Sequence, residues 1–358
     1  MKEEGQKIIS VTVKKPSNAG GAEIVWQNLK NKRINFENIS LEEKNLPFIY
    51  KKIPYFFHLK EIFASKWLLK KAKSKNPEII VYDKIFGWPK IKTKARKICY
   101  NHGSYTLAGL EFKRKNYFVY LIYKYFLGYF EKKSYKNAEK IIAVSESVKK
   151  EMKDYFKINK EKIHVIDNGV DLKKFKSLKN KKELRKKYSL PLNKKILFFP
   201  GRPSFGKGFD IAKKIVNELG EKYLLLVLGE KNKKEDNEKI KFTGKIPNEN
   251  MPEIYNSADI CLFPSRYEGN SVSVLESAAC GTPLVLSNAG LMKTEETMKE
   301  FVCKYPDEYI EKIKELLEDK KEYEKASKKW KKFSKDYSLE KQARELKKSL
   351  EDGNKRWV

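Results

Sequence analysis

The chain has 358 residues, of which 40% are hydrophobic and 13% aromatic, and its formal net charge is +31. This length can bury a sizeable core and favours two domains, and the composition excludes a disordered chain. No apolar segment follows residues 1–4, so no secretory signal is expected. The four cysteines and three histidines show neither CxxC nor zinc-ligand spacing, which favours reduced cysteines in a cytoplasmic protein.

The positive charge has two interpretations that the sequence leaves open. A compositional bias toward lysine would explain it, and the confinement of glutamine to three positions fits such a bias. Alternatively, the charge serves an anionic membrane surface, an anionic substrate or nucleic acid.

The first elements predict the opening of a nucleotide-binding α/β unit. Residues 8–13 are a β-rich run, a turn containing Gly20 and Gly21 follows, and a helical pattern comes next. Two adjacent glycines let a backbone approach a ligand closely. From residue 33 to residue 74 the chain is rich in lysine, and we expect one strand near 34–39 and a helix near 54–73.

Two compact apolar runs, residues 78–83 and 97–103, predict buried parallel strands. His102 falls at the carboxyl end of the second run, which is where open α/β sheets place their ligands.

The most apolar run, residues 117–130, lies between clusters of lysine. Its fourteen residues are fewer than the roughly 20 that span a bilayer. It is interpreted either as a buried crossover helix or as a helix with one face at the membrane interface.

The end of the first half has a strand entering a helix at 138–146, with Ser145 as the N-cap, and a strand ending in a turn at 165–171. The lysine-rich stretch 172–188 is predicted to be the linker between two domains.

The second half opens with a strand at 195–202 and a turn that Arg202 and Lys207 bracket. Two cations at a strand end can neutralise a diphosphate, and arginine adds forked donors to phosphate oxygens. The pattern Gly-Arg-x4-Lys-Gly-x-Asp, from residue 201 to residue 210, is far less frequent by chance than an Arg/Lys pair alone. Further elements are predicted in this order: strands at 223–228 and 240–247, a helix at 251–258, a strand at 259–264, and amphipathic helices at 309–320 and 337–350.

Residues 264–283 combine a turn, a helix and a helix stop. Ser271 is the expected N-cap, and Gly281 followed by a proline ends the helix. The unpaired N–H groups of a helix N-terminus can hold a phosphate. The carboxylates of Glu268 and Glu276 suit the hydroxyls of a sugar, so this element outlines a site for a sugar nucleotide.

Here the chain resembles a known family. The pattern Pro-Ser-x-x-Glu-Gly, followed by Leu-Glu-x-x-Ala-x-Gly-x-Pro, is similar to that of the family 4 (group 1) glycosyltransferases, which have the GT-B fold. The resemblance covers nearly the whole chain and is weakest over 33–96. One departure concerns the family's Gly-Gly-x-Pro-Glu turn, whose place is taken here by residues 289–293.

The resemblance implies a role for each candidate residue. Glu268, Lys207, Arg202 and His102 are the expected catalytic residues. Glu268 would hold the donor sugar, Lys207 and Arg202 would stabilise the departing diphosphate, and His102 would position a sugar hydroxyl or the acceptor. The expected substrate-binding residues are Gly20, Gly21, Glu276 for the ribose, Asn270, Ser271 and Val272 at the helix N-terminus, and Gly244, Lys245 and Ile246 for the nucleobase.

The fold implied is α/β, with two Rossmann-like domains facing a cleft and a C-terminal helix crossing back to the N-terminal domain. The expected boundaries are 1–172 for the acceptor domain, 173–335 for the donor domain and 336–358 for the returning helix. The expected activity is transfer of a hexose from a nucleotide-diphosphate sugar, such as a UDP-sugar, to an acceptor hydroxyl with retention, in glycan, glycolipid or polysaccharide synthesis. No cofactor or metal is expected.

The expected partners are the nucleotide sugar and a glycan or lipid-linked acceptor, with peripheral contact to an anionic membrane as a further expectation. Two alternatives stay open: a catalytically idle protein that binds nucleic acid or membrane through its charge, and a sugar-nucleotide epimerase or phosphorylase on the same fold. Against nucleic acid, the chain carries no nucleic-acid-binding motif.

Overall fold

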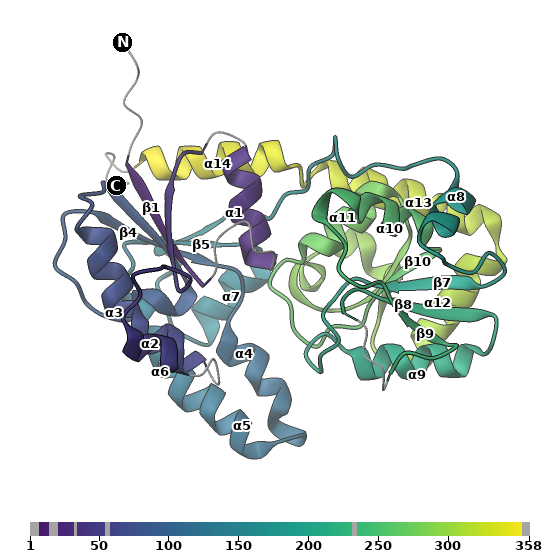
Figure 1. Cartoon of the computed structure of the whole chain (residues 1–358), viewed down its shortest axis with the longest axis horizontal. Coiled ribbons are helices and arrows are strands. Elements are labelled where there is room, and N and C mark those ends of the chain that lie inside the picture. Colours follow the sequence, from purple (N-terminus) through teal and green to yellow (C-terminus); the bar gives the residue numbers. More distant parts are fainter. Residues whose placement is uncertain (1–6, 14–20, 32–33, 54–57, 231–234, 353–358) are drawn as a thin grey trace, which may run out of the picture. The chain divides into compact units, whose positions relative to one another are not determined.

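The computed structural model describes residues 7–13, 21–31, 34–53, 58–230 and 235–352. The chain divides into two compact units, Met1–Asn168 with Glu340–Val358, and Gly169–Leu339. Each unit contains one six-stranded sheet whose paired strands are all parallel, with helices packed around it (Figure 1). The α/β prediction is therefore confirmed.

The sheet of the first unit has the strand order β2-β1-β3-β4-β5-β6. Its strands are β1 (Ile8–Thr12), β2 (Glu37–Ser40), β3 (Ile79–Asp83), β4 (Arg96–Asn101), β5 (Lys140–Ala143) and β6 (Ile163–Val165). The helices of this unit are α1 (Gly21–Asn31), α2 (Phe48–Lys52), α3 (Leu59–Lys73), α4 (Tyr105–Leu110), α5 (Tyr117–Leu121), α6 (Gly128–Asn137), α7 (Glu146–Asp154) and α14 (Leu339–Glu351). Strand β3 is buried along its whole length, which explains its unbroken apolar sequence. The order reverses between β1 and β3, which makes that position the topological switch point.

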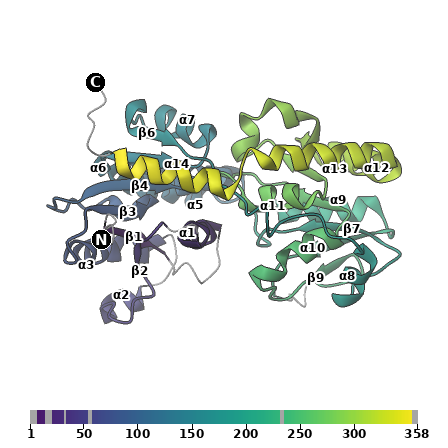
Figure 2. The ribbon, with the colours of Figure 1, turned by 90° about the horizontal axis from the view of Figure 1, so that it is seen from above.

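Helix α14 returns to the first unit, as the sequence predicted (Figure 2). Near its start, Gln342 donates a hydrogen bond to the hydroxyl of Tyr100 on β4 (3.1 Å). Near its end, the carbonyl of Leu350 accepts a hydrogen bond from Arg96 (2.8 Å), and that of Ser349 accepts one from Lys140 (2.7 Å). The helix therefore runs along β4 from its carboxyl end to its amino end.

The sheet of the second unit has the order β12-β11-β10-β7-β8-β9. Its strands are β7 (Lys195–Phe199), β8 (Tyr223–Val227), β9 (Ile240–Phe242), β10 (Ile260–Phe263), β11 (Leu284–Ser287) and β12 (Val302–Cys303). Its helices are α8 (Lys181–Lys187), α9 (Phe209–Leu219), α10 (Met251–Ser257), α11 (Val272–Cys280), α12 (Pro306–Glu318) and α13 (Lys320–Lys335). If these six strands are numbered 1 to 6 in chain order and the sheet is read from β9 to β12, the order is 3-2-1-4-5-6, which is that of dinucleotide-binding folds. The switch point lies between β7 and β10.

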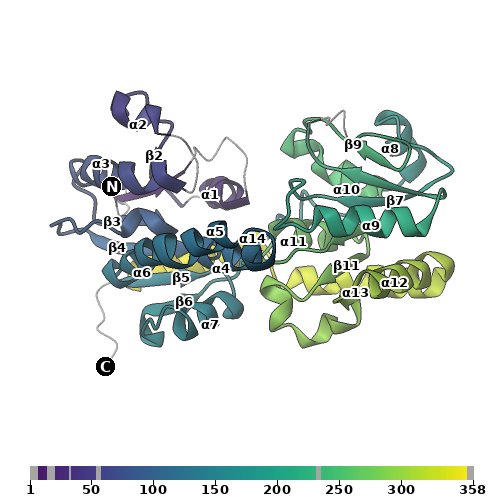
Figure 3. The same cartoon turned by 90° about the horizontal axis from the view of Figure 1, so that it is seen from below.

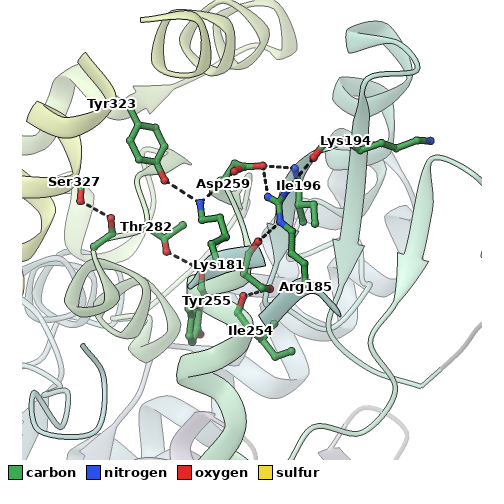
Figure 4. A network of polar contacts seen from close by, with 12 residues as sticks. Lys181, Arg185, Lys194, Ile196, Ile254, Tyr255, Asp259, Thr282, Tyr323 and Ser327 are labelled. Atoms are coloured by element: carbon green, nitrogen blue, oxygen red, sulfur yellow. Dashed lines mark hydrogen bonds and ion pairs between the residues drawn. The ribbon is translucent and has the colours of Figure 1, made fainter. Parts of the chain in front are cut away.

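The stretch predicted to be a linker, 172–188, is part of the second unit, and that prediction was wrong. It contains α8, whose Arg185 is buried and donates hydrogen bonds to the carbonyl of Ser257 (2.9 Å) and the carboxylate of Asp259 (2.6 Å). Lys181 also reaches that carboxylate (3.2 Å; Figure 4). Burial alone would raise the pKa of Asp259, but the two cations hold it below its usual value. The lysine-rich composition of this stretch thus gave no indication of helix α8, which ion pairs with Asp259 hold in place.

Candidate active site

The candidate site in the second unit lies where two loops leave neighbouring strands at the switch point. Strands β7 and β10 pair through Ile260 with Leu197 and Cys261 with Phe198. The loop after β7 carries Arg202 and Lys207, and the loop after β10 carries Glu268 and Asn270. In open α/β sheets this position holds the ligand.

Arg266 joins the two loops. Its backbone N–H donates to the carbonyl of Gly206 (2.9 Å), and its guanidinium donates to the carbonyl of Phe205 (2.6 Å). The same guanidinium makes a forked pair with the carboxylate of Asp210 (2.8 and 2.7 Å) and lies 3.7 Å from the centre of the Phe205 ring. The ion pair with Arg266 explains why the Gly-Arg-x4-Lys-Gly-x-Asp pattern ends in Asp210. This pair holds the loop after β7 against the loop after β10.

Gly208 permits the close approach of the loops. Its φ is +73°, and a Cβ placed there would lie 1.9 Å from the carbonyl oxygen of Pro264. Only glycine satisfies both the left-handed backbone and the lack of space.

Lys207 and Glu268, both predicted to be catalytic, form an ion pair. The Nζ of Lys207 lies 2.6 and 2.8 Å from the two carboxylate oxygens of Glu268. Ser265 donates a further hydrogen bond to Oε1 of the same carboxylate (2.8 Å). Two residues 61 positions apart in the sequence are thus held together by the loop contacts.

A third loop, after β11, completes this part of the site. Ser287 donates to the carbonyl of Ser265 (2.5 Å). Gly290 has φ +57°, and a Cβ there would lie 2.8 Å from the carbonyl oxygen of Gly269. The segment that departs from the family's glycine-rich turn therefore still supplies a glycine where the backbones meet.

A hollow of about 330 Å³, which includes open solvent, lies beside these loops. The polar residues that line it are Ser265, Glu268, Asn270, Ser271 and Ser287. Its apolar lining includes Phe263, Leu286 and Met292. A mixed lining of this kind suits a ligand with hydroxyls on an apolar ring frame.

Helix α11 begins at this hollow. Ser271 occupies the N-cap position, as predicted, but its side chain makes no capping hydrogen bond. The N–H of Val274 donates to the carbonyl of Ser271 (3.1 Å), so at the start of the helix the N–H groups of Val272 and Ser273 are the ones placed to meet another acceptor. The helix ends at Gly281 with φ +74°, as the sequence predicted.

Glu276 lies farther along α11 and is 5% exposed. Its Oε2 accepts a hydrogen bond from the hydroxyl of Tyr255 (2.7 Å). Burial raises the pKa of Glu276 to about 7, against the opposing effects of the Tyr255 hydroxyl and the Lys174 charge. The carboxyl group can therefore change its protonation state near neutral pH.

The remaining candidates of this unit are not joined to Glu268 by contacts. Arg202 is exposed, and no ion pair or hydrogen bond to its side chain occurs within the part of the chain that the structure describes. Gly244, with φ +73°, forms an isolated bridge with Gly229 after β9. Lys245 pairs with Glu230 (3.0 Å) and is highly exposed, and Ile246 packs against the core of the unit.

In the first unit, His102 follows β4 and is nearly buried, with 8% of its side chain exposed. Its ring stacks on Tyr100 (4.7 Å between centroids), and its Nε2 lies 3.6 Å from Oδ1 of Asp83. That aspartate, at the end of β3, accepts a hydrogen bond from the indole of Trp26 (3.2 Å). Nε2 of His102 is buried and has no hydrogen-bond partner among the described residues. Gly21 begins α1, and Gly20 lies outside the described residues.

Sequence reasoning missed several residues that shape the site. Ser265 and Ser287 bind Glu268 and its loop, and Tyr255 and Lys174 surround Glu276. Ser265 lay within the family pattern and could have been found there. Tyr255 and Lys174 carry no local signal, because only folding brings them to the carboxylate.

Across the described residues, no three His, Cys, Asp or Glu side chains gather in a way that could hold a metal ion.

Two family models match the chain. Residues 180–333 match the model described as glycosyl transferases group 1, and residues 35–174 match the one described as glycosyltransferase family 4.

The chain is also similar to curated glycosyltransferases. It is 28% identical to the uncharacterized glycosyltransferase MJ1607 of Methanocaldococcus jannaschii over 165 residues, 42% of each chain. It is 32% identical to the uncharacterized glycosyltransferase MJ1069 of the same organism over 218 residues, 56% of this chain and 53% of that one. The matches thus span about half the length of these relatives.

Solved structures share the fold at low identity. The sucrose-phosphate synthase of Thermosynechococcus elongatus superimposes with a TM-score of 0.77 at 16% identity, over 97% of this chain and 98% of that chain. Anabaena HepE, in complex with UDP and glucose, gives a TM-score of 0.71 at 14% identity, over 97% and 100%. Together with the two parallel sheets, these neighbours establish the GT-B fold.

Proposed function

Because the chain belongs to the group 1 family of glycosyltransferases, glycosyltransferase family 4, we propose that it moves a hexose from a nucleotide-diphosphate sugar to an acceptor hydroxyl with retention of anomeric configuration. The observation that carries this proposal is the joining of Lys207 and Glu268 beside a hollow at the switch point of the second unit. The acceptor is proposed to be a glycan or a lipid-linked acceptor.

In this proposal the Lys207–Glu268 ion pair is the state of the site before the donor arrives. The donor diphosphate takes the ammonium of Lys207, and the start of α11, where the Ser271 side chain makes no cap, supplies backbone N–H groups to the same phosphates. Glu268 is then released to accept hydrogen bonds from the sugar hydroxyls, while Ser265 holds its carboxylate in place.

The chemical step breaks the bond between the anomeric carbon and the diphosphate oxygen. The acceptor oxygen bonds to that carbon on the same face, and its proton passes to the departing diphosphate. Lys207 and Arg202 stabilise the charge that develops on the leaving group, and Glu268 steadies positive charge at the anomeric carbon. The proposed part of His102 is to orient a sugar hydroxyl or the acceptor.

Glu276 is proposed to bind the ribose. Its Oε2 already accepts a hydrogen bond from Tyr255, so the ribose hydroxyls would use its second oxygen. Hydrogen bonds from a diol favour the ionised carboxylate, so the donor should lower the pKa of this group and bind more tightly as pH rises through about 7. The substitution Glu276→Ala should weaken donor binding.

Calorimetry against uridine, guanosine and adenosine diphosphate sugars tests the proposal, beginning with UDP-glucose because the solved structure of HepE contains UDP and glucose. Lys207→Ala should lower turnover by about 10²–10³, a typical loss for one transition-state contact. Lys213→Ala is the matched control, because Lys213, on the adjoining helix α9, also forms a partly exposed ion pair, with Glu235 (2.9 Å). Unchanged transfer by the Lys207 variant would exclude the diphosphate role.

Metal independence is part of the proposal, because the cationic side chains and the helix N-terminus would neutralise the diphosphate. Activity should therefore persist in excess chelator. An absolute requirement for a divalent cation, restored by adding it back, would contradict this part.

A further inference from the structure

The helical segment 117–137 carries a stripe of exposed aromatic side chains. It is continuous from α5 through a π-helical turn, Ile122–Leu127, into α6 (Figure 3). We call these residues the aromatic face: Tyr117 (60% exposed), Phe118 (69%), Tyr125 (63%), Phe126 (39%) and Tyr129 (53%). A large apolar patch of this kind on a protein surface marks a site of interaction.

The opposite side of the same segment is anchored in the first unit. Tyr120, Leu127, Glu131 and Tyr135 are buried there. The carboxylate of Glu131 accepts hydrogen bonds from the backbone N–H groups of Tyr105 (2.8 Å) and Thr106 (2.9 Å) and from three hydroxyl groups. The helix cannot turn its aromatic face inward without breaking this network, so the exposure of the face is built into the fold.

The charges along the segment that carries the aromatic face are almost all positive. Between residues 111 and 137 the chain has only two carboxylates, Glu111 and the buried Glu131. The exposed lysines of this segment are Lys113, Lys115, Lys132, Lys133 and Lys136. The last three continue the helical stripe that contains Tyr129, and the Nζ of Lys133 lies 4.6 Å from the centre of that tyrosine ring.

We propose that the aromatic face docks on the surface of an anionic lipid bilayer. Tyrosine and phenylalanine with a border of lysine suit the boundary between headgroups and acyl chains, where rings enter the apolar region and ammonium groups meet lipid phosphates. No helix among the described residues is long and apolar enough to cross the bilayer, so the segment lies on the membrane surface. The proposal concerns a face of the first unit and is independent of the proposed catalytic roles.

Charge complementarity favours lipid over other partners. The cores of protein–protein interfaces are depleted of lysine, whereas here lysines adjoin the aromatic rings. Proteins that bind single-stranded nucleic acid line a groove with aromatic residues, whereas these rings lie on the outer side of a single helix.

Flotation of the full-length protein with vesicles tests the proposal. The protein should float with vesicles of mixed phosphatidylglycerol and phosphatidylcholine, and much less with phosphatidylcholine alone. The triple variant Phe118→Ser, Tyr125→Ser, Tyr129→Ser should lose at least about tenfold in partitioning, since three rings leave the interface. Replacing Lys132, Lys133 and Lys136 by glutamine should cost about fivefold for each lysine at low salt.

Matched controls come from the second unit. Tyr305→Ser removes an equally exposed ring (55%), and a triple lysine-to-glutamine variant at Lys320, Lys321 and Lys328 removes the same charge from α13. These variants should float like the wild type, and circular dichroism should show that all variants keep their fold.

Failure of the wild type to float, or equal losses in the control variants, would overturn the proposal. Two other results would also overturn the proposal, provided that the aromatic variant abolishes the effect. One is self-association in sedimentation velocity without vesicle binding, and the other is stronger binding of single-stranded RNA than of vesicles. Sugar transfer is not measured in any arm, so the outcome does not depend on the proposed activity.

Discussion

Replacing Glu276 by glutamine should make the stability of the second unit less sensitive to pH. The folded protein raises the pKa of this buried carboxyl from an ordinary 4.5 to about 7. Between those values the folded state binds more protons than the unfolded state, so stability is full below about pH 4.5 and is lost as pH rises toward 7. At about 1.36 kcal/mol for each pH unit, the loss amounts to roughly 3 kcal/mol.

Glutamine removes this titration while keeping the volume of the side chain and an acceptor for the hydroxyl of Tyr255. Comparing the two proteins at the same pH cancels the other titrations. The free energy of unfolding of Glu276→Gln, relative to wild type, should therefore increase by about 2.5 kcal/mol between pH 5 and pH 8.

Urea titration measures this difference, read by alkylation of the Cys261 thiol, which is buried and free in the second unit. Glu253→Gln is the matched control, because that carboxylate also accepts a hydrogen bond from a tyrosine, Tyr188, but hydrogen bonds from Lys187 and Tyr188 lower its pKa. Its folded and unfolded pKa values both lie below pH 5, so its difference should stay flat from pH 5 to pH 8. A flat difference for Glu276→Gln as well would refute the reasoning.

Two further substitutions test how the second unit is held together. Gly208→Ala should destabilise it by about 2 kcal/mol or more and weaken donor binding, because the new Cβ meets the carbonyl of Pro264. Gly220→Ala, where φ is also positive but nothing lies within 4 Å, should cost less in the same urea titration, and equal costs would contradict the argument from close approach. Asp259→Asn should lower the free energy of unfolding by about 3 kcal/mol, since Arg185 would lose its buried partner, and thermal unfolding with little change would show that the pair contributes nothing.

Much of the fold follows from local patterns along the chain. Apolar runs with β-branched residues predicted β3, β4, β7, β8 and β10, because strands buried on both faces of a parallel sheet need such runs. The N-cap at Ser145 and the helix stop at Gly281 were also predicted from local chemistry, and the structure has both.

Helices whose stability comes from distant contacts were harder to predict. The lysine-rich stretch that contains α8 has no local sign of order, since its helix is held by Asp259, some 74 positions away. Helix α13 was likewise not predicted. The exposed face of 117–130 could not be chosen from its sequence, because both faces of that helix are aromatic and the burial of Glu131 decides between them.

By itself the sequence determined the family, the α/β class and the residues from which a site could be built. The tertiary structure alone decided which of these residues contact one another. Lys207 pairs with Glu268 beside the hollow, and Glu276 accepts a hydrogen bond from Tyr255. The physical reason is that local patterns record the conformation of neighbouring residues, whereas an ion pair across 61 positions depends on the packing of whole loops.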